Sequence, residues 1–208
     1  MLNILLMISA VWLWGATGMV QAAENFCAER PQFTPGDSFS FVRTGYYNDV
    51  NTSRFRRVFK EVRGENLVFN VFFEKGGTTE VYFTLDMNFI RTRSGSIRYE
   101  PYDPALKFPL CVGTTSWTED FVIHSPDKEL IRRKRNARAE ALTTVTVPAG
   151  TFRVVKLQSD NQWLAPGVNQ PAREVYYYSP DLGIIIAYES PEFDIKTTLE
   201  SFSRVPSR

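Results

Sequence analysis

Few side chains in this sequence have the type and spacing needed for acid–base, nucleophilic or metal chemistry. His124 is the only histidine, it ends a predicted strand, and no G-x-S-x-G elbow is present to hold a nucleophilic serine. One histidine and two cysteines cannot complete a zinc site, and the acidic residues lack the spacing of a calcium loop. We therefore expect no enzyme activity, no catalytic residue, no metal and no cofactor. A hydrolase built on two scattered carboxylates stays open as the enzymatic alternative.

Two basic segments could instead bind an anion. They are residues 54–63 and residues 132–138, the second of which contains the run RRKR. The whole chain has 24 Lys and Arg against 23 Asp and Glu, so its net charge predicts no attraction to nucleic acid. We interpret both segments as solvated faces, and contact of residues 132–138 with anionic lipid headgroups or acidic polysaccharide is the alternative.

The N-terminal segment predicts export. Residues 1–23 contain no charged side chain, include the apolar run 4–14 and end in small residues, which is typical of a cleaved signal peptide. An uncleaved membrane anchor over residues 4–20 is the alternative. Cleavage would leave residues 24–208 as a single β-rich domain in the periplasm, with no membrane span.

The only two cysteines, Cys27 and Cys111, lie in this exported part. An exported chain with two cysteines most simply pairs them, and two separate buried thiols are the alternative. By the chain-entropy model the bridge would contribute roughly 4 kcal/mol.

Short alternating segments separated by Gly, Pro, Asn and Ser predict strands through most of the chain. Residues 143–152 (TTVTVPAGTF) predict the turn of a central hairpin whose second arm continues to residue 159. A strand is favoured for residues 53–64, with an amphipathic helix as the alternative, and residues 128–141 fit a strand or a helix equally well. The other predicted strands are 38–44, 66–74, 78–85, 87–93, 96–99, 117–123, 174–178, 183–189 and 194–202.

This pattern predicts a mainly β fold with little helix, a single-domain antiparallel meander that forms a curved sheet or half-barrel. Aromatic residues on one side of the predicted strands would cover its concave face. They would either fill the core or line a cavity for an apolar ligand. The candidate ligand-binding residues are Phe39, Phe41, Phe69, Phe83, Trp117 and Phe121.

Three segments carry a resemblance to a known group. They are residues 107–117 (KFPLCVGTTSW), 146–155 (TVPAGTFRVV) and 175–185 (VYYYSPDLGII). They resemble the TapB-like family of exported bacterial proteins of unknown function, which has a V-P-A-G-T-F strand turn and a later Y-x-P-x-x-G turn. The matching positions are Pro109, Gly113, Trp117, Val147, Pro148, Ala149, Gly150, Thr151, Phe152, Tyr178, Pro180 and Gly183.

The resemblance implies an antiparallel half-barrel similar to periplasmic lipoprotein carriers, in a Gram-negative periplasm. It transfers no functional residue, because the matched positions are turn and core types. The cysteine pair and the basic run at 132–138 are not part of the family pattern.

Together these features predict a soluble periplasmic binding or carrier module for an apolar or amphipathic ligand, such as a lipid, on the concave face of a curved sheet. The alternative is a cell-envelope interaction protein that docks another protein or a glycan through a sheet edge or a basic face. No nucleic-acid partner is expected. The identity of the ligand and the choice between an open and a packed inner face remain open from the sequence.

Overall fold

The structure is a computed structural model that describes residues 26–47, 52–126, 128–164 and 171–206. The predicted signal peptide lies outside these residues. The described residues form fourteen strands and one 3-10 helix, and none of their helices is long and apolar enough to cross a membrane. In chain order the elements are β1 (Cys27–Ala28), β2 (Ser38–Thr44), β3 (Ser53–Arg63), β4 (Asn66–Phe73), β5 (Thr78–Thr84), β6 (Phe89–Thr92), β7 (Arg98–Glu100), β8 (Leu110–Cys111), β9 (Ser116–Ser125), β10 (Lys128–Val147), β11 (Gly150–Trp163), β12 (Ala172–Ser179), β13 (Ile184–Ser190), η1 (Pro191–Phe193) and β14 (Ile195–Ser203).

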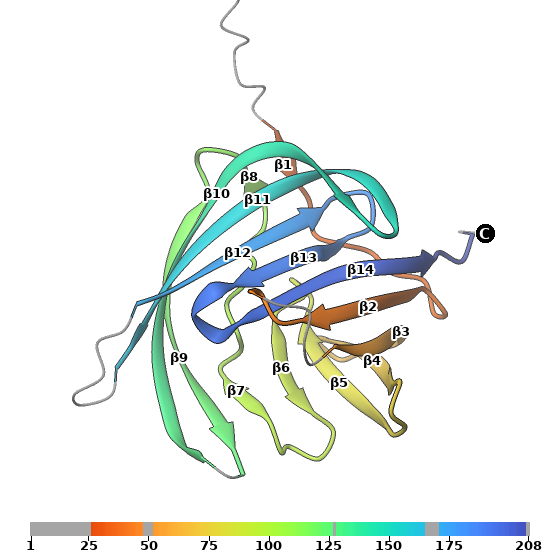
Figure 1. The fold of residues 1–208 in the computed structure, drawn as a ribbon, viewed down its shortest axis with the longest axis horizontal. Coiled ribbons are helices and arrows are strands. Elements are labelled where there is room, and N and C mark those ends of the chain that lie inside the picture. The colour runs from red at the N-terminus through yellow and green to blue at the C-terminus, as the bar shows by residue number, and fades with distance from the viewer. Residues whose placement is uncertain (1–25, 48–51, 127, 165–170, 207–208) are drawn as a thin grey trace, which may run out of the picture.

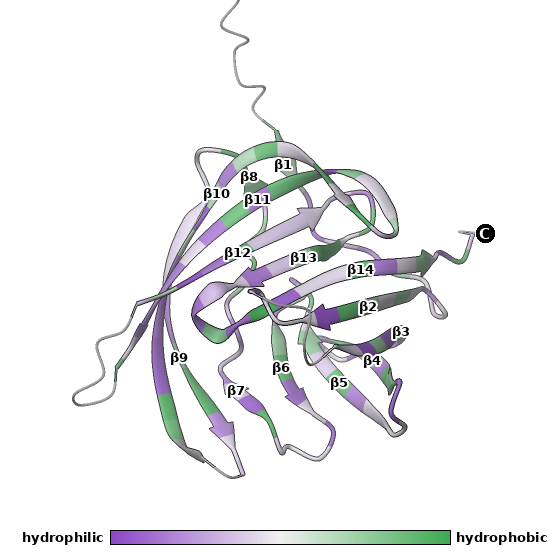
Figure 2. Ribbon diagram, viewed as in Figure 1, coloured by the Kyte–Doolittle hydropathy of each residue, from purple (hydrophilic) through white to green (hydrophobic). Residues whose placement is uncertain are grey.

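Alternation of apolar and polar residues explains why these segments are strands. In β2, Phe39 and Phe41 are buried while the residues between and beside them are not, and Figure 2 shows similar alternation along several other strands. The segments for which a helix remained open, β3 and β10, are strands. Each has a neighbour on both sides, β2 and β4 for β3 and β9 and β11 for β10, so sheet pairing outweighs the helix propensity of their Lys and Arg residues.

The sheet closes on itself, which corrects the expected curved sheet or half-barrel. Twelve strands form a closed barrel in the order β10-β11-β12-β13-β14-β2-β3-β4-β5-β6-β7-β9, with every neighbouring pair antiparallel (Figure 1). The closure depends on short strands, since β6 and β7 share a single register pair, Arg91↔Arg98, and β7 then pairs with β9. Strands this short carry too little alternation for their pairing to be predicted from sequence.

The central hairpin is confirmed as β10 and β11, which pair from Arg133↔Trp163 to Val147↔Gly150. Gly150 has φ +134, a conformation that L side chains rarely adopt, so the glycine of the V-P-A-G-T-F motif serves the turn. The two strands have 20 and 14 residues and arch over the other strands in Figure 1. They are the longest elements of the barrel and form much of its wall.

Chain segments without regular structure enter the barrel and fill part of it. The segment between β7 and β8 is held by Asn88, which is 2% exposed and bonds both backbone groups of Leu106 at 2.8 Å. The Trp117 indole donates to the carbonyl oxygen of Pro104 at 2.9 Å. Before β2, the Phe33 ring packs against the rings of Phe59 and Phe69, with centroids 5.4 and 5.3 Å away.

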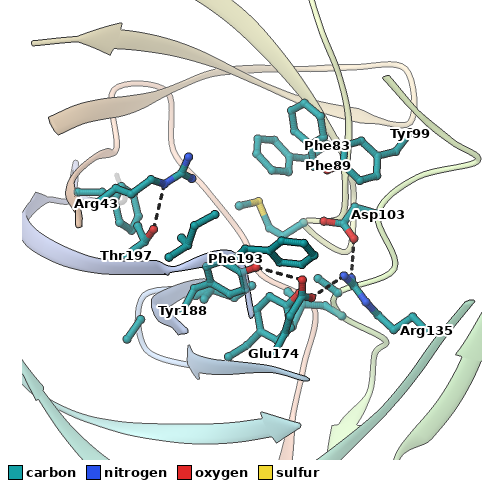
Figure 3. Close-up of a pocket in the computed structure, with 18 of the residues that line it drawn as sticks. Arg43, Phe83, Phe89, Tyr99, Asp103, Arg135, Glu174, Tyr188, Phe193 and Thr197 are labelled. Atoms are coloured by element: carbon teal, nitrogen blue, oxygen red, sulfur yellow. Dashed lines mark hydrogen bonds and ion pairs between the residues drawn. The ribbon is translucent and has the colours of Figure 1, made fainter. Parts of the chain in front are cut away.

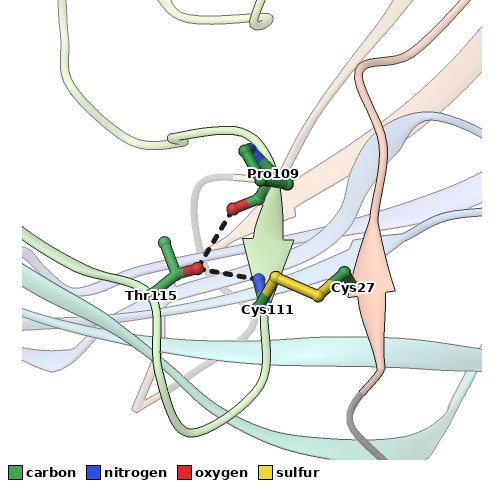
Figure 4. The surroundings of a disulfide bond; sticks show 4 residues. All are labelled: Cys27, Pro109, Cys111 and Thr115. Atoms are coloured by element: carbon green, nitrogen blue, oxygen red, sulfur yellow. Dashed lines mark hydrogen bonds between the residues drawn. A yellow bond between two sulfur atoms is a disulfide. The ribbon is translucent and has the colours of Figure 1, made fainter.

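The predicted disulfide is present and joins these two segments. Cys27 and Cys111 are bonded across the two-stranded sheet of β1 and β8, in which they are register partners (Figure 4). Thr115 Oγ1 accepts from the Cys111 amide at 2.8 Å and donates to the Pro109 carbonyl at 3.0 Å, which orders the turn after β8. The bridge spans a sequence separation of 84 residues, so it removes much conformational freedom from the unfolded chain.

Replacing both cysteines, Cys27→Ser with Cys111→Ser, should lower the free energy of unfolding by about 2–4 kcal/mol. The strands of the barrel do not depend on the bridge, so the variant should still fold. Urea denaturation of the variant and of the unaltered chain, each with and without reductant, measures the effect. Reductant should weaken only the unaltered chain, and equal stability of its oxidised and reduced forms would contradict the role of the bridge.

Candidate functional site

A cavity of about 410 Å³ lies inside the barrel. Its apolar wall comes from strands on opposite sides of the sheet and includes Phe41, Phe55, Phe83, Phe89, Ile123 and Ile185. Among the described residues, four arginines and two carboxylates also line it, an excess of two positive charges: Arg43, Arg57, Arg133 and Arg135 against Asp103 and Glu174. Figure 3 shows Arg43 with Thr197 on one side of the cavity and Arg135 with both carboxylates on the other.

Arg135 of β10 is the centre of a buried polar cluster. Its side chain is 2% exposed, and its Nη1 and Nη2 atoms donate to Asp103 at 2.5 Å and to Glu174 at 2.9 Å. The Nε atom donates to Asn161 Oδ1 at 2.9 Å, and the guanidinium lies 5.2 Å from the Phe121 ring centroid. Arg135 therefore ties the inner segment that carries Asp103 to the barrel wall formed by β11 and β12.

The two carboxylates of this cluster differ in their electrostatics. Burial raises the pKa of Asp103 above its ordinary value, and the Arg135 charge only partly opposes that effect. Burial also acts to raise the pKa of Glu174, but Arg135 and the Tyr176 hydroxyl outweigh it and hold that pKa below its ordinary value. Glu174 accepts from Tyr176 at 2.5 Å and from Tyr188 at 3.1 Å as well as from Arg135. These three donors take the place of water around the buried carboxylate and stabilise its charged form.

The other three arginines of the cavity have no such partner. Among the described residues, no carboxylate forms an ion pair with Arg43, Arg57 or Arg133. Arg57 faces the rings of the apolar wall, and Arg133 lies over two further rings near the polar cluster. The cavity thus combines an apolar wall, one arginine with two carboxylate partners and three arginines with none.

The six aromatic residues predicted to bind a ligand fall into two groups. Phe41 and Phe83 line the cavity. Phe39 and Phe69 instead pack against Phe33 in the filled part of the barrel. Trp117 is held by the inner segment, as described above, and Phe121 stacks on Tyr99 with ring centroids 5.9 Å apart. A role in ligand binding stays a prediction for all six.

The basic segments supplied three of the cavity residues that the sequence interpretation missed, Arg57, Arg133 and Arg135. Arg133 and Arg135 are in phase with the buried Ala137 and Ala139 of β10, so they point into the barrel rather than forming a solvated face. In β3, Arg57 likewise lines the cavity together with Phe55, two residues before it. Strand alternation points every second residue of each run into the barrel, and this signal is lost when a run is interpreted as one undivided block of charge.

His124 does not line the cavity. Its Nε2 atom lies 3.1 Å from Glu100 Oε2 on the neighbouring strand β7. Among the described residues, no three His, Cys, Asp or Glu side chains are grouped so that they could hold a metal ion.

No protein-family model and no curated protein matches this chain. Three solved structures share its fold: one described as a lipoprotein from Parabacteroides distasonis (14% identity, 86% of this chain and 100% of that chain covered, TM-score 0.53), an exported protein with a YmcC-like fold from Bacteroides fragilis (13%, 86% and 100%, 0.50), and the hypothetical lipoprotein YmcC from Escherichia coli (10%, 85% and 92%, 0.50). Identities this low show the fold alone. They agree with the expectation of a fold found in exported proteins, and the TapB-like assignment rests on the sequence motifs only.

Replacing Arg135 by Met should lower the free energy of unfolding by about 3–5 kcal/mol, because Asp103 and Glu174 would remain buried without their cation. The matched control carries Asp103→Asn and Glu174→Gln as well, and it should recover about half of that loss since no unpaired charge is left. Urea denaturation at neutral pH measures both variants. A control no more stable than Arg135→Met would show that charge pairing is not what the cluster contributes.

The same comparison has an expected pH dependence. The pKa of Glu174 is lowered in the folded chain from an ordinary value of 4.5, so its stabilising contribution is present above pH 4.5 and is lost as the pH falls through the folded pKa. In Arg135→Met burial acts on both carboxylates without the opposing cation, so they take up protons at a higher pH than in the unaltered chain, and the stability difference should shrink as the pH falls from neutral through 4.5. Denaturation curves measured across the acid range test this, and a constant difference would contradict it.

Proposed function

We propose that this protein is an exported binding or carrier module that holds an apolar or amphipathic ligand inside its barrel. The observation that carries the proposal is the cavity of about 410 Å³ with an apolar, largely aromatic wall. Ligand sites in proteins typically measure about 300–1,000 Å³ and combine apolar lining with a few placed polar groups. The expected ligand site thus moves from the concave face of an open sheet to the interior of a closed barrel.

The rigidity of the cavity walls supports this proposal. The two hydrogen bonds between Asn88 and Leu106 and the three hydrogen bonds of Arg135 hold the inner segment against the barrel wall without any ligand. A preformed site avoids the entropy cost of ordering side chains when the ligand binds. The proposed site therefore needs little rearrangement of its walls when a ligand binds.

Three observations support export as part of the proposal. The chain holds a disulfide, its fold is similar to proteins described as exported or as lipoproteins, and residues 1–23 have the composition of a cleaved signal peptide. Membership of the TapB-like family, inferred from the V-P-A-G-T-F and Y-x-P-x-x-G motifs, is part of the same proposal.

The alternative, an envelope protein that docks a partner through a sheet edge or a basic face, has less support. Closure gives each of the twelve barrel strands a neighbour on both sides. In the described part of the chain, the free edge that strand addition would need is confined to strand ends, such as that of β10 beyond Arg138, which pairs with β11 alone. Two arginines of the basic run, Arg133 and Arg135, line the cavity and so leave the outer face less basic than the sequence suggested.

Filling the cavity should abolish ligand binding. Ala187 of β13 lines the cavity and is 5% exposed, so Ala187→Phe would place a ring in the proposed ligand volume. We expect affinity for the neutral fluorescent probe N-phenylnaphthylamine to fall at least about tenfold, a change of about 1.4 kcal/mol. Fluorescence titration of the purified exported protein measures it.

The matched control is Ala141→Phe, the same change in β10 at a residue that does not line the cavity. It should bind the probe like the unaltered chain. Thermal unfolding of both variants checks that they are folded, because overpacking alone costs about 1–3 kcal/mol. A folded Ala187→Phe variant with unchanged affinity, or an unaltered chain that binds no apolar probe, would overturn the proposed function.

A further inference from the structure

Arg57 is a charged side chain in apolar surroundings without a counter-ion. Its Cζ atom lies 5.2 Å from the ring centroids of both Phe41 and Phe55, and 5.4 Å from that of Phe83. No carboxylate of the described residues pairs with it. Burial, together with the charge of the nearby Arg43, lowers the pKa of Arg57 to about 10, so it is still a cation at neutral pH. An uncompensated charge in such surroundings is costly to the folded chain.

Two further arginines of the cavity have donors to spare. Arg43 is exposed, and of its guanidinium nitrogens only Nε has a described partner, Thr197 Oγ1 at 3.2 Å. Arg133 lies over the rings of Trp163 and Phe193, with its Cζ atom 4.3 and 4.9 Å from their centroids. Its Nε atom is buried and has no hydrogen-bond partner in the described part of the chain.

Arg135 shows what a compensated arginine looks like in the same cavity. Its three bonds go to Asp103, Glu174 and Asn161, so the two carboxylates of the cavity are already engaged by it. The charges of Arg43 and Arg57 are therefore left without a counter-ion among the described residues, while Arg133 acts from a longer range on the same two carboxylates, in the direction that lowers the pKa of each. Guanidinium groups match the planar, two-oxygen geometry of carboxylates and phosphates and bind them through paired hydrogen bonds.

The remainder of the cavity indicates what the part of the ligand away from the arginines should be. Beside Arg57 the wall consists of aromatic rings, and Ile123 and Ile185 continue it. A volume of about 410 Å³ is at the small end of ligand cavities, which fits one apolar chain better than a lipid with two. The cavity therefore combines cations and an apolar wall within one small space.

We infer that the cavity binds an amphiphile with a single apolar chain and an anionic headgroup, a carboxylate or a phosphate, and that Arg57 neutralises the headgroup with help from Arg43 and Arg133. This inference rests on the proposed function, because it specifies the ligand of the same cavity. Binding of the headgroup supplies the counter-ion that Arg57 lacks among the described residues.

Four ligands that are each built on one linear chain of twelve carbons test the inference by competition with N-phenylnaphthylamine, which is neutral. Dodecanoate and dodecyl phosphate should displace the probe at least about tenfold more effectively than dodecanol, since each adds charge-assisted hydrogen bonds. Dodecyltrimethylammonium should be weaker than dodecanol because it meets an excess of positive charge. The ratio of the affinities for dodecanoate and dodecyl phosphate identifies which headgroup the site prefers.

Arg57→Met removes the charge and keeps much of the side-chain length. It should reduce the affinity for dodecanoate at least about tenfold while leaving that for dodecanol unchanged. Because the variant removes an uncompensated charge, its Tm without ligand should rise by about 2–4 °C. Arg56→Met is the matched control, since Arg56 is exposed, does not line the cavity and lies over the Phe72 ring. It should change neither affinity.

The possible failures are distinguishable. If dodecanol and dodecanoate bind equally well, or if Arg57→Met binds dodecanoate as the unaltered chain does, the anionic headgroup is wrong and the proposed function stands. If none of the four ligands binds or displaces N-phenylnaphthylamine, the proposed function fails together with the inference about the headgroup. Should Arg57→Met not fold, the comparison of the four ligands on the unaltered chain still decides.

Discussion

The width of the barrel is the constraint on which the other features depend. Side chains just fill a barrel of about eight strands, and the diameter grows with strand number, so a barrel of twelve needs additional chain inside it. The segment between β7 and β8 and the residues before β2 supply that chain. Their buried backbone groups need hydrogen-bond partners, and Asn88, Trp117 and the carbonyl of Phe89, which accepts from the Asp103 amide at 2.8 Å, provide them. The inserted chain fills part of the barrel and leaves the remainder as the cavity.

The position of the inserted chain also determines the charges of the cavity. It brings Asp103 to Arg135, and with Glu174 of β12 this gives one buried arginine two counter-ions. Such a cluster stabilises the fold only while all its members are present, because each carboxylate or guanidinium left alone would carry the full cost of burial. Arg57 lies on β3, across the barrel from the strands of the polar cluster, with aromatic rings around it. No described carboxylate of the inserted chain or of the neighbouring strands forms an ion pair with it. The same side-chain type therefore has a structural role at one position and a free charge at another.

Much of the fold could be predicted from the sequence because it depends on local signals. Alternating residues predicted β2, β4, β5 and β12 to β14, and the V-P-A-G-T-F segment predicted the central hairpin. The expectation of export, together with the two cysteines, predicted the disulfide. Closure could not be predicted, since it depends on pairings between strands that are not consecutive, β14 with β2 and β7 with β9, and on the short β6 and β7, which share one register pair. A pairing between such short strands is decided by the curvature of the whole sheet, and no local pattern encodes it.

The site was less predictable than the fold for two physical reasons. Strand alternation assigns a side chain to the inside of the barrel, but only the inserted chain decides whether that inside is packed or open, and its Pro-rich sequence has no periodicity to place it. Phe41 and Phe83 therefore line the cavity while Phe39 and Phe69, equally regular in sequence, are packed core. The basic run gave the opposite error, because a block of charge suggests solvent while the period of a strand sends Arg133 and Arg135 inward. In a barrel wide enough to hold a cavity, period two places charged residues as well as apolar ones, and an inward arginine without a carboxylate partner is then evidence about the ligand.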